Sequence, residues 1–316
     1  MKTISYIVLL LTGFALAGCD SLKQEVSPDR LANEPEKLVV AFFISPQDTV
    51  LAARVGRSST VLGQNSLSFF NVLNAVVTLS DGSRSVSLTN AVLSDRGFNP
   101  YYRATPEQLP IVAGKTYTLT VSVPNGQTVT ATCTVPGPVA LDNVLIDSTV
   151  RTEIGLAYKE YFARLRWRDP AGQINYYRAA GQNDFSFRMS IFTSPNTPPR
   201  DTLIRIWQPG SWFFSNGSTI TDVGQDGQEM VSGRGRLAVA FSFQNGQQTI
   251  SLPQSPLTAH LLNVDVNYYR YHDEVDRQSR AGRNPFAEPV LIQTNIRGGL
   301  GCFGAYNKST LVTELK

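Results

Sequence analysis

The sequence predicts a mainly β protein made of two β-sandwich-like domains, the second with one helix near its C-terminus. Short runs of alternating apolar and polar residues recur between turn residues, which is the pattern of half-buried antiparallel strands. Hydrophobic residues make up 42% of the 316 residues, so the chain can fill packed cores and is not globally disordered. Helical spacing of apolar residues is found in one segment close to the C-terminus.

The N-terminus predicts a signal peptide over residues 1–18 and a lipid anchor at Cys19. Lys2 supplies a positive charge, and the apolar stretch 4–17 is too short to span a bilayer comfortably. This end of the chain resembles the bacterial lipoprotein box through Leu16-Ala17-Gly18-Cys19. In that box the thiol is alkylated with diacylglycerol and the chain is cut before the cysteine. The alternative is an ordinary secretory signal that contains a chance cysteine.

Residues 19–36 predict a tether, because they are charged, lack an apolar period and contain Pro28 and Pro35. No later apolar run is long enough for a transmembrane helix, so the lipid alone is expected to attach the protein to the membrane. The expected location is the cell outer membrane, on either its periplasmic or its outward-facing side. The net charge is +3 without a run of Lys or Arg, which argues against nucleic acid as a partner.

An immunoglobulin-like β-sandwich domain is predicted over residues 37–136. The apolar run 38–44 has the length of a strand, and 75–88 predicts a hairpin that turns at Asp81-Gly82. A second hairpin is expected over 117–135, where apolar residues alternate with Thr and Ser. Strands at this spacing, separated by turn residues, are typical of a sandwich.

Two cysteines remain once Cys19 is assigned to lipid. Cys133 lies on the apolar face of the second hairpin, and Cys302 lies in the glycine-rich C-terminal segment. An isolated buried thiol explains each of them. A disulfide between them is the alternative, because exported proteins fold in an oxidising compartment.

A domain boundary is expected at Pro136-Gly137-Pro138, which is stiff and pairs poorly with a strand. The domain that follows, residues 139–316, is expected to be rich in β structure. Four of its strands are predicted from alternation and turn residues. In chain order these strands are 161–167, 174–180, 203–207 and 237–243.

One helix is predicted over 264–278, because apolar and aromatic residues recur there at helical spacing. A glycine-rich closing hairpin is expected after it, with strands at 290–296 and 300–306. Repeated glycines in this segment predict positive φ angles or close approach of another backbone. The neighbour expected across the glycines is the helix that carries Tyr268 and Tyr271.

Short motifs spread over nearly all the mature chain resemble those of a known family. Two of them form the tail motif, Asn284-Pro285-Phe286-Ala287-Glu288-Pro289 and Asn295-Ile296-Arg297-Gly298-Gly299-Leu300-Gly301. The others are found at 113–119, 221–222, 226–227, 268–271 and 303–306. Together they resemble a lipoprotein family of Bacteroidota that is catalogued as domain of unknown function 4249.

The resemblance implies a role in the cell envelope. Members of that family often sit beside TonB-dependent outer-membrane receptors. The expected function is therefore that of a non-catalytic lipoprotein, an accessory or binding partner of such a receptor. The alternative is a stand-alone surface binding module for glycan or peptide. No cofactor and no enzymatic activity are expected.

Acid–base or metal chemistry has only two histidines to draw on, His260 and His272. Neither has a nucleophile elbow nearby, so no catalytic triad is expected. His272 and Asp276 lie four residues apart on the predicted helix, where a solvated face is favoured over a metal site.

A calcium loop is the alternative weighed for a group of acidic residues, Asp222, Asp226 and Glu229, that surrounds Gly227. The ligand spacing of the helix–loop–helix calcium motif is not met, so no metal is expected. The glycine–arginine repeat at 233–236 is expected to form a flexible turn, because a phosphate cradle needs a strand–loop–helix frame.

A cluster of large aromatic residues is the candidate surface for a partner or ligand. Pro209-Gly210 predicts a hairpin tip beside it, and exposed aromatics at such a tip stack on sugars or anchor proteins. The alternative is a small satellite core beneath the loop. The four residues of the cluster are Trp207, Trp212, Phe213 and Phe214.

Overall fold

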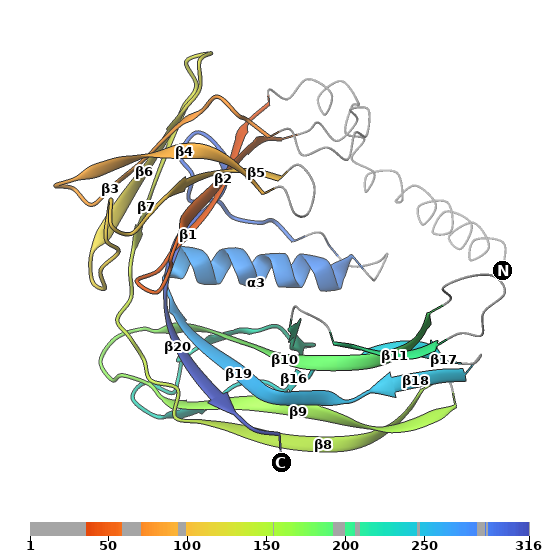
Figure 1. Ribbon diagram of the computed structural model, residues 1–316. Helices are drawn as coiled ribbons and strands as arrows, with labels where there is room; N and C mark the ends of the chain where they lie inside the picture. The colour runs from red at the N-terminus through yellow and green to blue at the C-terminus, as the bar shows by residue number, and fades with distance from the viewer. Residues whose placement is uncertain are drawn as a thin grey trace, which may run out of the picture.

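The structure is a computed structural model (Figure 1). It describes residues 36–58, 71–93, 99–153, 155–191, 200–205, 209–244, 247–282, 288 and 290–315. The signal peptide, Cys19 and nearly all of the tether lie outside the described residues, as do Trp207 and most of the 284–289 motif.

Seven strands form the N-terminal part of the fold. They are β1 (Leu38–Ile44), β2 (Leu51–Arg57), β3 (Val76–Ser80), β4 (Ser85–Leu93), β5 (Asn99–Ala104), β6 (Thr116–Ser122) and β7 (Thr128–Thr134). Both predicted hairpins are present: β3 pairs with β4 across the Asp81-Gly82 turn, and β6 pairs with β7. Their turns match the sequence because Gly82 and Gly126 both have positive φ.

The C-terminal part contains the remaining strands and the helix. In chain order they are β8 (Asn143–Glu153), β9 (Leu156–Arg168), β10 (Tyr176–Ile191), β11 (Arg200–Arg205), β12 (Gly210–Ser211), β13 (Phe213–Phe214), β14 (Thr219–Thr221), β15 (Glu229–Val231), β16 (Gly235–Arg236), β17 (Ala240–Gln244), β18 (Gln247–Ser251), β19 (Pro253–Val264), α3 (Val266–Ala281) and β20 (Leu300–Thr313). This content confirms a mainly β protein with one helix near the C-terminus of its described part. The division into two sandwich domains near 136–138 stays a prediction.

Three sheets organise these strands. The largest follows the order β11-β10-β19-β20-β1-β2-β5-β4-β3-β6-β7, and β12 and β14 also pair with β10. A second sheet has the order β13-β16-β9-β15 with β8 paired to β9, and β17 pairs with β18. In Figure 1 the helix α3 lies between the group β1–β7 and the group that contains β8, β9 and β10.

Alternating burial explains why these segments are strands. On β1 every second side chain is fully buried, from Leu38 through Val40 and Phe42 to Ile44. On β9 the predicted apolar face is confirmed, because Leu165 is fully buried between two other fully buried residues of the same face. The buried faces of β1 and β9 belong to separate hydrophobic clusters, one made mainly by β1–β7 and the other by β9, β10 and β19.

Several predicted boundaries shift. The strand predicted at 174–180 begins at Tyr176 and continues to Ile191, and the strand predicted at 237–243 begins at Ala240. Residues just before Ala240 leave the β17–β18 pairing because the amide of Ala238 donates to the Asn183 side chain at 2.9 Å. The glycine–arginine repeat is not a turn as expected, since Gly235 and Arg236 form strand β16 beside β9.

The closing hairpin expected at 290–306 is wrong. Segment 290–296 is not a strand, and β20 instead pairs in parallel with β1 from Leu300 to Ala305. From Tyr306 to Thr313 the same strand pairs antiparallel with β19. One continuous strand therefore belongs to both groups of strands, as Figure 1 shows.

In place of that hairpin, segment 295–297 links β7 to β20 through hydrogen bonds. The side-chain amide of Asn295 donates to Phe303 O at 2.7 Å and to Thr132 O at 3.3 Å, and its oxygen accepts from Phe303 N at 3.0 Å. Arg297 exchanges two backbone hydrogen bonds with Thr130 of β7. The Asn295 side chain hydrogen-bonds to both β7 and β20. Its segment therefore connects these two strands without itself becoming a strand of the sheet.

The repeated glycines of this segment predicted positive φ angles or close approach of a neighbouring backbone, and this is confirmed. Gly301 has φ +103°, and a Cβ built there would lie 2.0 Å from Val40 O of β1. A Cβ on Gly304 would lie 2.9 Å from Cβ of Tyr268 in α3. Glycine at these two positions allows β1 and the helix to approach β20 closely.

The helix α3 begins two residues later and ends three residues later than predicted. Val264 remains in β19, paired with Tyr176 and Tyr306, so the helix starts after it. Asp265 is the N-cap and accepts a hydrogen bond from Tyr268 N at 2.7 Å. Among the helices that the structure describes, none has the length and apolar character needed to cross a membrane.

Replacing Gly301 with alanine should destabilise the fold by about 2 kcal/mol or more, because a side chain there meets both a positive φ and the backbone of β1. Gly137→Ala is the matched control, since nothing lies within 4 Å of a Cβ at Gly137. Urea denaturation of both variants measures the effect. Equal free energies of unfolding for the two variants would show that β1 and β20 are not packed this tightly.

Candidate functional site

The described aromatic residues of the candidate surface lie on the short segment 212–214, which we call the aromatic loop although Phe213 and Phe214 form the two-residue strand β13. Trp212 is buried with 6% of its surface exposed, whereas Phe213 is 47% exposed. Phe214 is half-buried and packs where a side chain of Gly235 would lie, 2.6 Å from a Cβ built there. The loop therefore combines the two expectations, because Trp212 belongs to a core and Phe213 faces outward.

Trp212 is held flat against β10. Its backbone amide donates to Gly181 O at 2.8 Å, and a Cβ on Gly181 would lie 2.1 Å from the indole ring. Only glycine at 181 leaves room for this ring. The indole Nε1 is buried and has no hydrogen-bond partner among the described residues. An unpaired donor of this kind is costly to bury and suits a ligand that brings an acceptor.

A hollow of about 210 Å³ lies between this aromatic loop and α3. The aromatic loop supplies its apolar side, and the last turns of the helix supply charged and hydroxyl groups. Its lining residues are Trp212, Phe213, Phe214, Ser215, Ser218, Asp276, Ser279 and Arg280. Small polar ligands are the class that an apolar wall with a few polar groups can hold.

A second hollow, of about 530 Å³, opens on the other side of Phe213. Three arginines, Arg151, Arg234 and Arg236, line it together with the buried carboxylate of Glu160. Glu160 accepts hydrogen bonds from Arg151 at 3.2 Å and from Arg236 at 3.3 Å. We call this the arginine hollow.

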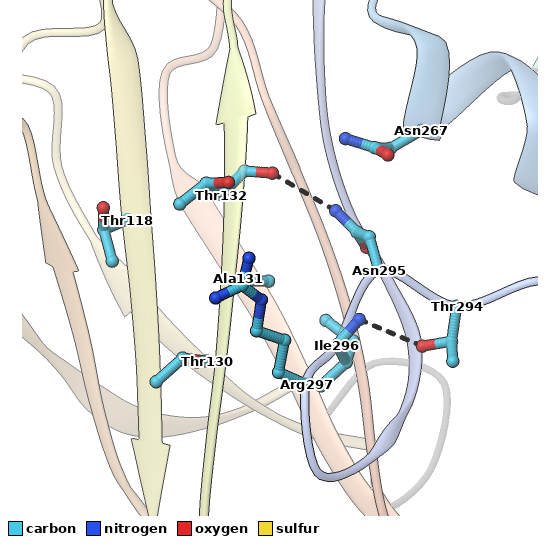
Figure 2. Close-up of a pocket in the computed structure, with 9 residues that line it drawn as sticks. All are labelled: Thr118, Thr130, Ala131, Thr132, Asn267, Thr294, Asn295, Ile296 and Arg297. Atoms are coloured by element: carbon cyan, nitrogen blue, oxygen red, sulfur yellow. Dashed lines mark hydrogen bonds between the residues drawn. The ribbon is translucent and has the colours of Figure 1, made fainter.

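A third hollow, of about 570 Å³, lies where segment 294–297 crosses β7, and Figure 2 shows its lining. Thr118, Thr130 and Thr132 contribute the outer faces of β6 and β7, as their alternation predicts. The hydrogen bond from Asn295 to Thr132 O crosses it. Its polar groups are explained by the connection between β7 and β20.

The acidic group weighed as a calcium site differs in the structure from the one in the sequence: Asp169 joins it and Glu229 does not belong to it. Asp169, Asp222 and Asp226 place one carboxylate oxygen each within 4.8 Å of one another, whereas Glu229 lies in β15 outside this group. Sequence spacing missed Asp169, which belongs to the turn after β9.

Protein donors already engage these carboxylates. Asp169 accepts from Tyr177 OH at 2.5 Å and from Gly227 N at 2.9 Å. Asp222 accepts from Asn175 N at 2.8 Å, and Asp226 accepts from the backbone amide of the β9–β10 turn. Burial and the Asp169 carboxylate raise the pKa of Tyr177 well above its usual value, which keeps this hydroxyl a donor. The cluster thus ties two turns together.

The solvated helix face expected at His272 is wrong, because its ring packs among aromatic rings. Its ring lies 4.3 Å from the ring of Tyr268 and 5.0 Å from that of Phe43, measured between centroids. Its Nδ1 is 3.2 Å from Nη1 of Arg178, which is always a donor, so Nδ1 accepts and the proton resides on Nε2. Burial first, and Arg178 second, lower the pKa of His272 to about 3.

The other reactive side chains have structural surroundings as well. His260 contacts Thr310 Oγ1 at 2.9 Å, and burial lowers its pKa. Cys133 and Cys302 are both buried free thiols, so the isolated-thiol interpretation is confirmed and the disulfide is absent. Burial raises the pKa of both thiols, which keeps them protonated and unreactive.

The arginine hollow was missed by sequence reasoning. The outward row of arginines on β9 was visible in the alternation around Arg164, but the hollow is lined by Arg151 of β8, Arg236 of β16 and Arg234 just before β16. Only strand pairing brings β8, β9 and β16 together, and nothing local in the sequence reveals that pairing.

The fold defines a mainly β protein in which one helix packs between two groups of strands, with polar hollows around an aromatic loop. The domain of unknown function DUF4249 matches residues 23–311, and the chain belongs to this family. No curated protein matches the chain.

The partly buried His272 should make stability depend on pH. Its pKa is about 3 in the folded protein and 6.5 when exposed, so the unfolded chain binds more protons and stability falls as pH drops below 6.5. His272→Phe keeps the ring packing and removes this titration. Its stability deficit relative to wild type should therefore shrink on acidification, by up to about 1.4 kcal/mol per pH unit.

Urea denaturation of both proteins at several pH values between neutral and mildly acidic measures this difference. Burial raises the pKa of Asp265 to about 6, which gives an opposite slope between its ordinary value of 3.8 and 6. That contribution is common to both proteins and cancels in the comparison. A deficit that stays constant with pH would show that His272 does not have the lowered pKa that its packing implies.

Proposed function

We propose that this protein is a lipid-anchored lipoprotein of the cell outer membrane, an accessory or binding partner of a TonB-dependent receptor without catalytic activity. The observation that carries the proposal is the lipoprotein box at residues 16–19, directly after a short apolar segment with Lys2 ahead of it. A charged, proline-containing tether then separates the box from the β-rich body.

The environments of the reactive side chains support a binding role. Both histidines have their pKa lowered by burial, and both described cysteines have theirs raised. General acid–base or nucleophilic chemistry needs groups poised to exchange protons near neutral pH, and His272 and the two thiols are not such groups.

A stand-alone binding module for glycan or peptide is the second candidate. The observation that favours it is the pair of hollows that flank Phe213, one against α3 and one among arginines. Hollows of this kind hold small ligands without help from a receptor.

Changing Cys19 to Ser should abolish lipid attachment and leave an uncut precursor, because the thiol is the alkylated group. Metabolic labelling with a fatty acid and mass spectrometry of the N-terminus test this. Cys133→Ala is the matched control and should label normally, since Cys133 is a buried body residue. A wild-type mature N-terminus at any residue other than Cys19 would refute the anchor.

Purification of the tagged full chain from detergent-solubilised outer membranes should recover an outer-membrane barrel in stoichiometric amount. The anchor and the proposed partner lie in the same membrane, so the complex should survive mild detergent. The Cys19→Ser variant, expressed at the same level, is the control that shows whether recovery of the barrel depends on membrane attachment. Recovery of a soluble ligand without any barrel would favour the stand-alone binding module.

A further inference from the structure

The outer face of the second sheet carries an ordered row of aromatic and charged residues. Strand register places Phe213 of β13 opposite Arg236 of β16, Arg236 opposite Phe162 of β9, and Phe162 opposite Asp147 of β8. Residues directly opposite one another lie on the same face of a sheet. The other face of β9 is the fully buried core face around Leu165.

The charges on this face do not balance. Glu160 pairs with Arg151 and Arg236, Asp147 pairs with Arg234 and Arg164, and Glu153 pairs with Arg151. Among the residues that line the hollow, three guanidinium groups face one carboxylate, so its lining carries an excess of positive charge. The excess charge is what an anionic ligand would neutralise.

The guanidinium donors are not saturated by these partners. A guanidinium has five N–H donors, and the hydrogen bonds found among the described residues use one nitrogen of Arg234 and one of Arg236. Donors therefore remain for a ligand carboxylate, which guanidinium groups bind in a bidentate manner.

Aromatic rings hold two of these arginines in place. The guanidinium carbon of Arg234 lies 3.8 Å from the centroid of the Phe162 ring, and that of Arg236 lies 5.4 Å from the centroid of Phe213. Phe213 is 47% exposed, so part of its ring remains open to a ligand. Ser215 and Asn216 are exposed polar residues that line the same hollow.

We infer that the arginine hollow binds an acidic sugar, that is, a sugar ring that carries a carboxylate. Its volume of about 530 Å³ lies in the range of small-ligand sites. The excess of guanidinium groups favours an anionic ligand, and a planar carboxylate fits their paired N–H donors. The exposed ring of Phe213 offers a stacking surface, and Ser215 and Asn216 offer partners for sugar hydroxyls.

This inference deepens the proposed binding role, on which it rests, by naming the ligand class. The two fail separately, because sugar binding is measured on the isolated full chain and receptor association is measured on membranes. A protein that recovers a barrel but ignores acidic sugars would refute the inference and leave the receptor proposal standing.

Calorimetric titration of the detergent-solubilised full chain with a trimer of galacturonic acid tests the inference. The wild-type protein should bind the trimer at low ionic strength and bind it more weakly as salt is added. A neutral trisaccharide of the same length, inorganic phosphate and a glutamate tripeptide are titrated in parallel, and each should bind more weakly than the sugar acid.

Two variants locate the site. Arg234→Gln and Phe213→Ala should each weaken trimer binding by about tenfold or more, because each removes one contact that the site supplies. Arg234 is suitable because Asp147 keeps its ion pair with Arg164. Arg277→Gln, which makes the same charge change on an exposed residue of α3, should bind as wild type does.

Three outcomes would overturn the inference. The first is a wild-type protein that does not bind the trimer, and the second is an Arg234→Gln variant that binds it as tightly as wild type. The third is phosphate or the glutamate tripeptide binding as tightly as the sugar acid, which would replace the ligand class. Thermal unfolding of each variant, compared with that of Arg277→Gln, establishes that the losses are not losses of folding.

Discussion

The arrangement of this protein depends on the double pairing of β20. The first half of the strand forms a parallel ladder with β1, and the second half forms an antiparallel ladder with β19. One set of backbone hydrogen bonds therefore holds both groups of strands and places α3 against them. The ladder tolerates the close neighbours on its two sides because Gly301 and Gly304 carry no side chain.

The connection between the two groups is fixed by the same region. Segment 136–139 contains two prolines, so it cannot pair as a strand, and its carbonyl groups need other donors. Asn307 donates to Pro136 O at 3.1 Å, Asn263 donates to Gly137 O at 3.0 Å, and Ser309 donates to Val139 O at 2.5 Å. These donors come from β19 and β20. The segment that the sequence predicts as a stiff linker is thus held in place by side-chain hydrogen bonds from β19 and β20.

Local features of this fold were predictable and long-range ones were not. The β3–β4 and β6–β7 hairpins follow from alternation with period two and from turn glycines, and α3 follows from helical spacing, all within short windows. The pairing of β20 with β1 joins opposite ends of the chain and leaves no such local signal. Glycines around Gly299 resembled a hairpin turn, although their role is close approach to Leu38 and Val129. In the candidate site, Phe213 could be predicted from the local sequence, because it lies beside the Pro209-Gly210 turn signal. The arginines of the hollow could not, because strand pairing brings them together from separate parts of the chain.

The outer face of the second sheet is difficult to explain by folding alone. Burying the carboxylate of Glu160 between Arg151 and Arg236 carries a desolvation cost, and a well-packed apolar group at such a place is often as stable or more so. Leaving Phe213 half exposed forgoes hydrophobic stabilisation that full burial would supply. Both features cost stability at the same hollow, next to an excess guanidinium charge. A ligand that brings a carboxylate and an apolar ring face would offset both costs together, which is why binding accounts for this face better than folding does.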